Sequence, residues 1–226
     1  MQQSEYEPMG SDSESIYLGS MARARQIQSE QRAQIRDSTR TNIMSAAREV
    51  AKREGAARLS LRSVAAEAGF APAALYVYFR NKNDLMLALA ADDLADIAQL
   101  MREAYARGNK ATPSWAAVSA TLDVLSKSET LAAAASALNS QSDTPAERLF
   151  NGRLIAVLSA LAAITGALSK AREGQADVLL TASVLTGLAM LVRSGRLKAL
   201  GFAPDEVLAR LPHWLEGTVA NPQIAG

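Results

Sequence analysis

Cysteine is absent from this chain of 226 residues, and histidine occurs once, as His213. The lack of cysteine excludes a disulfide framework, a thiol nucleophile and a cysteine-ligated metal, and it fits a reducing cytoplasm. No His-Glu-x-x-His, P-loop or dinucleotide-binding glycine pattern is found. We therefore expect no enzyme activity, no metal and no cofactor, and we expect His213 to be a surface or interface residue.

Aromatic residues and long apolar segments are also scarce. Aromatics make up 5% of the chain, whereas 49% of it is hydrophobic, with many Ala and Leu. This composition favours helices over sheets and predicts an all-α fold. No N-terminal segment has the pattern of a signal peptide. The longest apolar runs, 154–169 and 178–192, hold roughly 15 residues each, fewer than the ~20 that span a bilayer. We expect buried helices there, no membrane partner and a cytoplasmic location.

Charge is distributed unevenly along the chain, although the net charge is only +1. Residues 1–20 contain four acidic and no basic side chains, whereas residues 21–84 contain twelve Lys/Arg against six Asp/Glu. A concentrated basic region is the electrostatic feature that a polyanionic partner requires. A solvated basic face is the alternative explanation when this region is considered by itself.

Within this basic region, the stretch that begins at Ser60 has the pattern of two short helices and a tight turn. Ser60 suits an N-cap, because its hydroxyl can accept a backbone N–H of the first turn. Gly69 follows that helix, where a left-handed residue ends it at little cost, and Pro72 suits the first turn of the next helix. Leu75 and Phe79 are four residues apart and face the first helix. This is a helix-turn-helix, with its second helix placed to enter a major groove.

The residues that carry the wider pattern are Ile43, Ala46, Ala47, Gly55, Ser60, Val64, Ala65, Ala68, Gly69, Phe70, Ala71, Leu75, Tyr76, Tyr78, Phe79, Lys82 and Leu85. In order and spacing they closely resemble the DNA-binding domain of the tetracycline-repressor-type (TetR) family of bacterial regulators. The resemblance covers roughly residues 38 to 88. Phe70 and Ala71 replace the family's usual Val and Ser/Thr, so the usual hydroxyl cap of the recognition helix is absent.

The resemblance implies DNA contacts at particular residues. Ser60, Tyr76, Tyr78 and Lys82 match positions that contact phosphates in the family. The recognition helix offers only small apolar side chains, which can approach thymine methyl groups, so Arg62 on the preceding helix is the best candidate for a guanine contact. The alternative is that Arg62 contacts only phosphate. The complete predicted set is Arg40, Ser60, Leu61, Arg62, Ala71, Pro72, Ala73, Ala74, Tyr76, Tyr78 and Lys82.

Composition and periodicity divide the chain into three regions, 1–36, 37–84 and 85–226. The resemblance implies that they are an N-terminal extension, the DNA-binding domain, and a ligand-binding and dimerisation domain. Residues 1–19 are expected to be disordered, since they are polar, acidic and without periodicity. Residues 20–40 form a basic arm that contains Arg23, Arg25, Arg32, Arg36 and Arg40. Such an arm can lie in a minor groove, and the alternative is a tail without specific DNA contact.

Apolar periodicity predicts helices over 38–54, 83–107, 114–127, 129–139, 145–171, 175–194 and 204–217. The helix over 83–107 leaves the DNA-binding domain and enters the rest of the chain, so we expect it to be the mechanical link. Gly174 is expected to separate the two helices that flank it. Gly195 to Pro204 is expected to be a connector.

The C-terminal region resembles the family's ligand-binding domain only in layout. It should enclose a pocket for a small lipophilic effector. The candidate ligand-binding residues are Met101, Tyr105, Trp115, Leu122, Asn139, Phe150, Arg153 and Leu154, and ordinary core packing is the alternative for each.

The helix over 175–194 is apolar almost all round, so it should be covered on every side. A second copy can cover it by two-fold symmetry, and the family dimerises through its last two major helices. The candidate dimer-interface residues are Val184, Leu188, Leu191, Leu208, Leu211 and Trp214.

Together these features predict a homodimeric repressor that a small ligand releases from a palindromic operator in double-stranded DNA. One alternative is a ligand-independent or architectural DNA-binding protein, for which a closed core without a cavity would argue. A second alternative is a helical-bundle enzyme or carrier, for which a metal or cofactor in the purified protein would argue.

Overall fold

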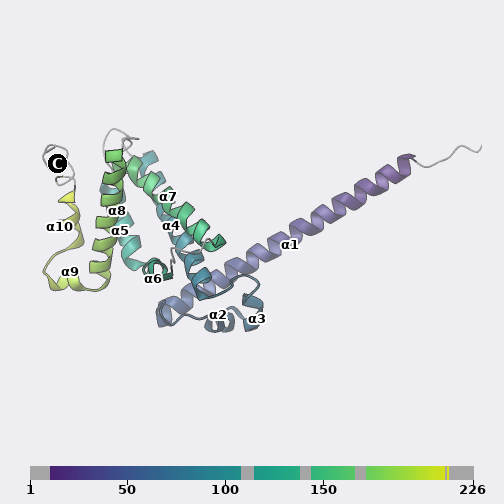
Figure 1. Ribbon diagram of the computed structural model, residues 1–226, viewed down its shortest axis with the longest axis horizontal. Coiled ribbons are helices and arrows are strands. Elements are labelled where there is room, and N and C mark those ends of the chain that lie inside the picture. The colour runs from purple at the N-terminus through teal and green to yellow at the C-terminus, as the bar shows by residue number, and fades with distance from the viewer. Residues whose placement is uncertain (1–10, 108–114, 138–143, 166–171, 212, 214–226) are drawn as a thin grey trace, which may run out of the picture.

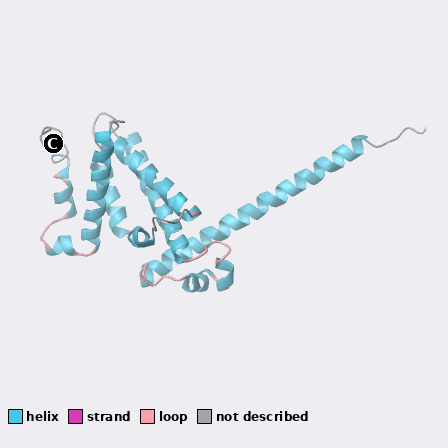
Figure 2. Cartoon of the chain, viewed as in Figure 1, coloured by secondary structure: helices cyan, strands magenta, loops and turns pink. Residues whose placement is uncertain are grey.

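The computed structural model describes residues 11–107, 115–137, 144–165, 172–211 and 213. Throughout these residues the regular elements are helices, which confirms the predicted all-α class (Figures 1 and 2). The helices are α1 (Ser11–Glu54), α2 (Leu61–Ala68), α3 (Pro72–Leu75), α4 (Lys82–Arg107), α5 (Trp115–Lys127), α6 (Glu129–Ala137), α7 (Pro145–Thr165), α8 (Arg172–Arg193), α9 (Arg196–Ala199) and α10 (Pro204–Leu208).

Helix α1 is much longer than the sequence suggested, because it begins at Ser11 and not near residue 38. Its N-terminal half projects from the body as a single helix (Figure 1). Residues 20–40 are rich in Arg, Gln and Ala, which are good helix formers, and proline is absent from all of α1. The disorder expected for residues 1–19 is therefore wrong from Ser11 onward, and residues 1–10 lie outside the described part of the chain.

The N-terminal helix-turn-helix domain has its own core. This core includes Ile43 and Val50 from α1, Val64 from α2, Leu75 from α3 and Leu85 from α4, each at most 1% exposed. Burying side chains of this size contributes about 1.5–3 kcal/mol each. Because α1, α2, α3 and the first turns of α4 share one core, the recognition helix is held by the helices around it.

Helix α4 connects this domain to the rest of the molecule. Its first turns belong to the helix-turn-helix core, whereas Leu94 packs with Ala134 and Phe150 in a middle cluster. Farther along, Met101 joins the core that α5, α7 and α8 build. The long link predicted over 83–107 is thus confirmed, with its start at Lys82. A movement of α4 would therefore displace side chains in all three clusters.

Several predicted boundaries in the C-terminal half are wrong. Gly174 does not separate two helices, because it lies buried inside the first turn of α8. A glycine costs about 1 kcal/mol in a helix interior, and burial of the following apolar turns offsets it. The expected connector contains α9. Helix α10 ends at Leu208, a turn follows at 209–210, and residues 214–217 of the predicted final helix lie outside the described residues.

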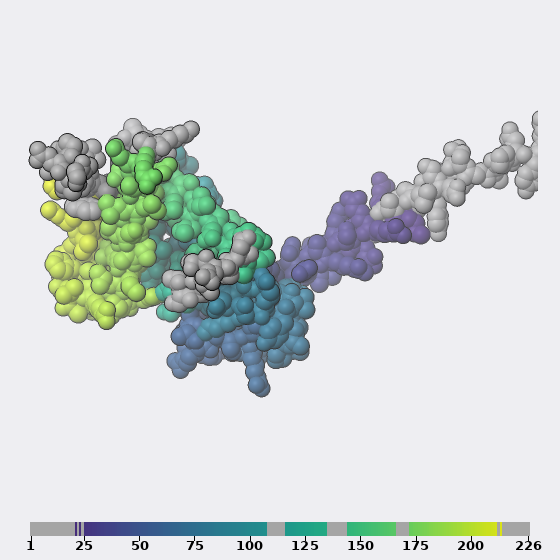
Figure 3. Space-filling view, viewed as in Figure 1, coloured from purple at the N-terminus to yellow at the C-terminus, as the bar shows by residue number. Residues whose placement is uncertain are grey.

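The two longest helices of the C-terminal half, α7 and α8, leave apolar side chains exposed. Both helices are coloured green in the space-filling view of Figure 3. Exposed residues on α7 are Leu149, Leu154 and Ile155, and on α8 they are Leu179, Leu180, Met190 and Leu191. Only 22% and 28% of their most apolar windows are buried. By length and composition alone both could cross a membrane, a test that core helices of soluble proteins also pass. Within a single chain, the outer faces of these helices are therefore not buried.

Candidate nucleic-acid interface

The first helix of the motif, α2, is capped at both ends. At its start the Ser60 hydroxyl accepts a hydrogen bond from the Ser63 backbone N–H (3.1 Å), and the Ser63 hydroxyl accepts one from the Ser60 N–H (3.1 Å). At its end Gly69 has φ +74°, and the Phe70 N–H reaches the Ala65 carbonyl at 2.9 Å. Both caps confirm the sequence interpretation. A left-handed residue at Gly69 turns the chain sharply toward α3.

The recognition helix α3 is short and is held from one side. Ala71 is its N-cap and makes no side-chain capping bond, as the departure from the family pattern predicts. Leu75 (0% exposed) and Phe79 (3% exposed) pack into the domain core. The opposite face carries Tyr76 and Val77, which are 60% and 66% exposed. This face is available to a partner, with the rest of the motif fixed behind it.

Side-chain bonds tie the neighbouring turns to this motif. Lys82 Nζ donates a 2.6 Å hydrogen bond to the Ala57 carbonyl, which joins the start of α4 to the loop between α1 and α2. Arg53 at the end of α1 lies 2.9 Å from Glu67 of α2. Its hydrogen bonds to Glu67 and Glu54 raise the pKa of Arg53 above its usual value. These bonds fix the loops that precede α2 and α4.

Most of the predicted DNA contacts lie on the outside of this domain. Ser60, Arg62, Ala71, Pro72, Ala73 and Tyr76 are exposed, and Arg40, Ala74, Tyr78 and Lys82 are partly exposed. Leu61 is the exception, because its side chain is 7% exposed and packs in the core. It follows Ser60 at the first position of α2, where helical periodicity turns its side chain inward. Leu61 is therefore a core residue, and only its backbone faces the α2 N-terminus.

Two of these residues already have partners within the chain. The Arg40 guanidinium lies 5.4 Å from the centre of the Phe79 ring, a cation–π distance. It joins α1 to the segment that follows α3. The Lys82 ammonium, bound to Ala57, has two remaining N–H groups that can reach a phosphate. Arg62 keeps an exposed side chain on α2. Chemically, the surface offers donors for phosphates around a small apolar helix.

The helical form of α1 affects the predicted arm. Arg23, Arg25, Arg32 and Arg36 lie on helix that is exposed on all sides. An α-helix with its side chains is about 10–12 Å across, whereas a B-DNA minor groove is about 6 Å wide. The arm cannot enter a minor groove as this helix, so the minor-groove interpretation does not fit the structure. Contacts of its arginines with phosphates from outside the groove remain compatible with it.

None of the clefts lined by described residues contains the candidate effector residues. Met101 and Leu122 are buried in one core with the partly buried Tyr105, whereas Phe150 belongs to the middle cluster. Arg153 and Leu154 lie on the exposed face of α7. The Trp115 side chain and Asn139 lie outside the described residues. Three clefts, of about 310, 380 and 180 Å³, are lined by other residues.

The candidate dimer residues also divide into two groups. Leu188, Leu208 and Leu211 are 5–8% exposed and pack inside the single chain, whereas Leu191 is 38% exposed and Val184 is partly exposed. Trp214 lies outside the described residues, and His213 is exposed, as expected. The interface predicted from the sequence did not include the exposed Leu149, Ile155, Leu179 and Met190. On a helix that is apolar all round, periodicity cannot indicate which face packs within the chain.

Comparisons with known proteins agree with this architecture. Residues 43–89 match the model of bacterial regulatory proteins of the tetR family. A TetR transcriptional regulator from Rhodococcus sp. RHA1 is 17% identical, with 78% of this chain and 93% of that chain covered and a TM-score of 0.54. A protein of unknown function from the same organism is 23% identical, with 79% and 94% covered and a TM-score of 0.63. The transcriptional regulator FadR from Bacillus subtilis, solved with stearoyl-CoA, is 20% identical, with 76% and 96% covered and a TM-score of 0.55.

The all-helical fold and the helix-turn-helix define a DNA-binding regulatory protein. Residues 43–89 therefore form a DNA-binding domain of the type found in bacterial regulatory proteins of the tetR family. Members of this family are DNA-binding transcriptional regulators and not enzymes.

Proposed function

We propose that the protein is a homodimeric transcriptional repressor that binds a palindromic operator and is released by a small lipophilic ligand. The observation that carries this proposal is the capped helix-turn-helix, whose outer face lies inside the basic region of the sequence. Ser60, Arg62, Tyr76, Tyr78 and Lys82 are the proposed DNA contacts, with Arg62 as the residue that reads a guanine. The proposed domain boundaries are 1–36, 37–84 and 85–226, and the proposed location is cytoplasmic.

Dimerisation is supported by the uncovered apolar faces of α7 and α8. Ile155 on α7 and Met190 on α8 are 63% and 66% exposed, and both helices carry further exposed leucines. A second copy related by two-fold symmetry would cover these faces with a four-helix interface. The proposed interface thus moves from Leu188, Leu208 and Leu211 to Ile155, Leu179, Met190 and Leu191. Dimerisation would place two recognition helices about one helical turn apart, roughly 34–36 Å.

An effector is supported by FadR, whose structure contains stearoyl-CoA, and by the apolar interior of the C-terminal domain. Met101, Leu122 and Tyr105 pack together where α4 meets α5. A long acyl chain would need such a surrounding, because burial of each CH₂ contributes about 0.8 kcal/mol. Release would follow if the ligand favours a protein conformation that fits the operator poorly.

A selection experiment tests this proposal. Wild-type protein is incubated with a random duplex DNA pool, bound DNA is sequenced, and the enriched fragment is then titrated with stearoyl-CoA and, separately, with free stearate. We expect a palindrome with half-sites one helical turn apart, and loss of the complex with at least one of these probes. Failure to enrich any sequence would contradict the DNA-binding proposal. Enrichment without release by either probe would favour a ligand-independent DNA-binding protein.

A further inference from the structure

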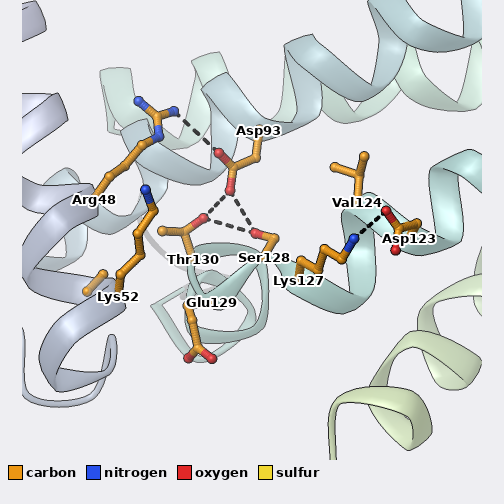
Figure 4. A pocket seen from close by; sticks show the side chains of 10 residues that line it. Arg48, Lys52, Asp93, Asp123, Val124, Lys127, Ser128, Glu129 and Thr130 are labelled. Carbon is orange, nitrogen blue, oxygen red and sulfur yellow. Dashed lines mark hydrogen bonds and ion pairs between the residues drawn. The ribbon is translucent and has the colours of Figure 1, made fainter.

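A polar cluster joins the DNA-binding domain to the C-terminal domain where α1, α4 and the turn between α5 and α6 meet. It consists of Arg48 on α1, Asp92 and Asp93 on α4, and Ser128 and Thr130 at the start of α6 (Figure 4). We refer to these five residues as the Asp93 junction. None of them is among the proposed DNA or effector contacts.

Asp93 occupies the centre of the junction. Its Oδ1 lies 3.3 Å from the Arg48 guanidinium, and its Oδ2 accepts hydrogen bonds from the hydroxyls of Ser128 (2.7 Å) and Thr130. The Asp93 side chain is 17% exposed, and Thr130 is 5% exposed. One carboxylate on α4 therefore contacts both α1 and the α5–α6 turn in a largely buried place, where hydrogen bonds to a charged group are comparatively strong.

Asp92, which precedes Asp93 on α4, is more exposed to solvent than Asp93. It also faces Arg48, at 3.4 Å, but its side chain is 47% exposed. The two hydroxyls of the α5–α6 turn bond to Asp93. An exposed ion pair contributes little, because solvent screens it. Two adjacent carboxylates therefore lie beside one arginine, and the more buried of them, Asp93, is bonded to the C-terminal domain.

The α5–α6 turn connects this hydrogen-bond network to α8. The Ser128 hydroxyl caps α6 by accepting the Leu131 N–H (3.1 Å), while the Ser128 carbonyl accepts a hydrogen bond from Arg193 at the end of α8 (3.1 Å). A continuous chain of hydrogen bonds therefore runs from α1 through α4 and α6 to α8. Hydrogen-bond networks of this kind can carry coupling between distant sites when both sites influence their arrangement.

The junction borders a cleft of about 310 Å³, so one side of it is open. Lys52, Lys127, Asp123 and Glu129 also line this cleft (Figure 4). Lys52 pairs with Glu49 at 2.9 Å and Lys127 with Asp123 at 2.6 Å, so these neighbouring charges are satisfied locally. An open side gives the junction room to break and re-form without repacking an apolar core.

We propose that Asp93 is a positioning residue, which fixes the DNA-binding domain against the C-terminal domain in the operator-binding arrangement. Opening of the junction frees α1 from the α5–α6 turn and weakens DNA binding. This inference rests on the proposed repressor function for its effect on DNA, but its structural part does not depend on that function.

The test compares Asp93→Ala with Asp92→Ala, since each removes one carboxylate next to Arg48 from the same helix. The chain has no cysteine, so spin labels attach only at Ser45→Cys on α1 and Ala120→Cys on α5, both exposed. Double electron–electron resonance on the full chain without DNA should give a displaced or broader distance distribution for Asp93→Ala. The distribution for Asp92→Ala should match that of the labelled parent. Thr130→Val, which keeps the side-chain shape, should follow Asp93→Ala and serves if that variant does not fold.

DNA affinity is the second readout, measured on the fragment enriched by the wild-type protein. We expect Asp93→Ala to weaken binding about tenfold, within the usual range of coupling between sites, and Asp92→Ala to have little effect. Equal distance distributions for Asp93→Ala, Thr130→Val and the parent would overturn the inference. Tighter DNA binding by Asp93→Ala would overturn it too, because the junction would then hold the released arrangement. If no fragment is enriched, the repressor proposal fails, and the distance measurement still decides the role of Asp93.

Discussion

The helix-turn-helix domain and the C-terminal domain differ in how completely one chain buries its own apolar surface. In the first, the large apolar side chains from Ile43 to Leu89 are buried or partly buried, apart from Tyr76 and Val77 on and beside the recognition helix. In the second, α7 and α8 leave seven large apolar side chains exposed. Contiguous apolar surface of this kind marks an interaction site. The first domain buries most of its apolar surface within one chain, whereas the second leaves apolar surface that the proposed dimer would cover.

The largest expected effect comes from placing a charge on the exposed or the buried face of α8. Met190→Glu places a charge on the exposed face, so we expect a folded monomer that loses operator binding. Leu188→Glu buries a charge inside the chain, and we expect it to cost several kcal/mol and prevent stable folding. Analytical ultracentrifugation and thermal unfolding separate the two outcomes. Met21→Glu, on the exposed part of α1, is the control and should leave the dimer intact; a dimeric Met190→Glu protein would rule out this interface.

The next comparison lies within the recognition segment. Leu75→Ala removes a fully buried side chain and should lower the free energy of unfolding by about 2–5 kcal/mol. Val77→Ala, two residues later on the exposed face, should change stability by less than about 0.5 kcal/mol. Chemical denaturation measures both. Similar losses for the two variants would mean that the segment is not held from one side.

DNA contacts separate in a third comparison. Arg62→Ala should cost about 1–3 kcal/mol on the enriched site and relax preference at one guanine. Lys82→Ala should weaken binding to every sequence similarly, because phosphates carry no sequence information. Binding titrations on the enriched site and on a set of single-base variants provide the measurement. Equal, non-selective losses would show that Arg62 contacts only phosphate.

The smallest expected effect concerns the projecting part of α1. A variant that lacks residues 1–36 loses four arginines while Ile43 and the core remain, so we expect weaker DNA binding and a shallower salt dependence. A variant that lacks only residues 1–19 is the control, since it removes acidic side chains and no arginine. Unchanged affinity and unchanged salt dependence in the longer deletion would show that the arm takes no part in binding.

The two domains also differ in how much of their structure can be predicted from the sequence. Ser60, Gly69 and Pro72 are local signals, since each acts on backbone within a few residues, and the structure confirms the caps they predict. Leu188 and Met190 are both apolar and lie on one apolar helix, so only tertiary packing distinguishes the buried residue from the exposed one. The Asp93 junction was missed for a similar reason, because its members are separated by up to 82 positions between Arg48 and Thr130.

Salt dependence of operator affinity tests the central claim, DNA binding by the basic helix-turn-helix domain, most directly. Fluorescence anisotropy on the enriched fragment from low to high salt gives the slope of log affinity against log salt. Each neutralised phosphate contributes about −0.9 to that slope. The proposed phosphate contacts are Ser60, Tyr76, Tyr78 and Lys82, and Arg40 and Arg62 are basic side chains of the same domain, so a steep negative slope is predicted. A flat slope on every fragment would contradict the account.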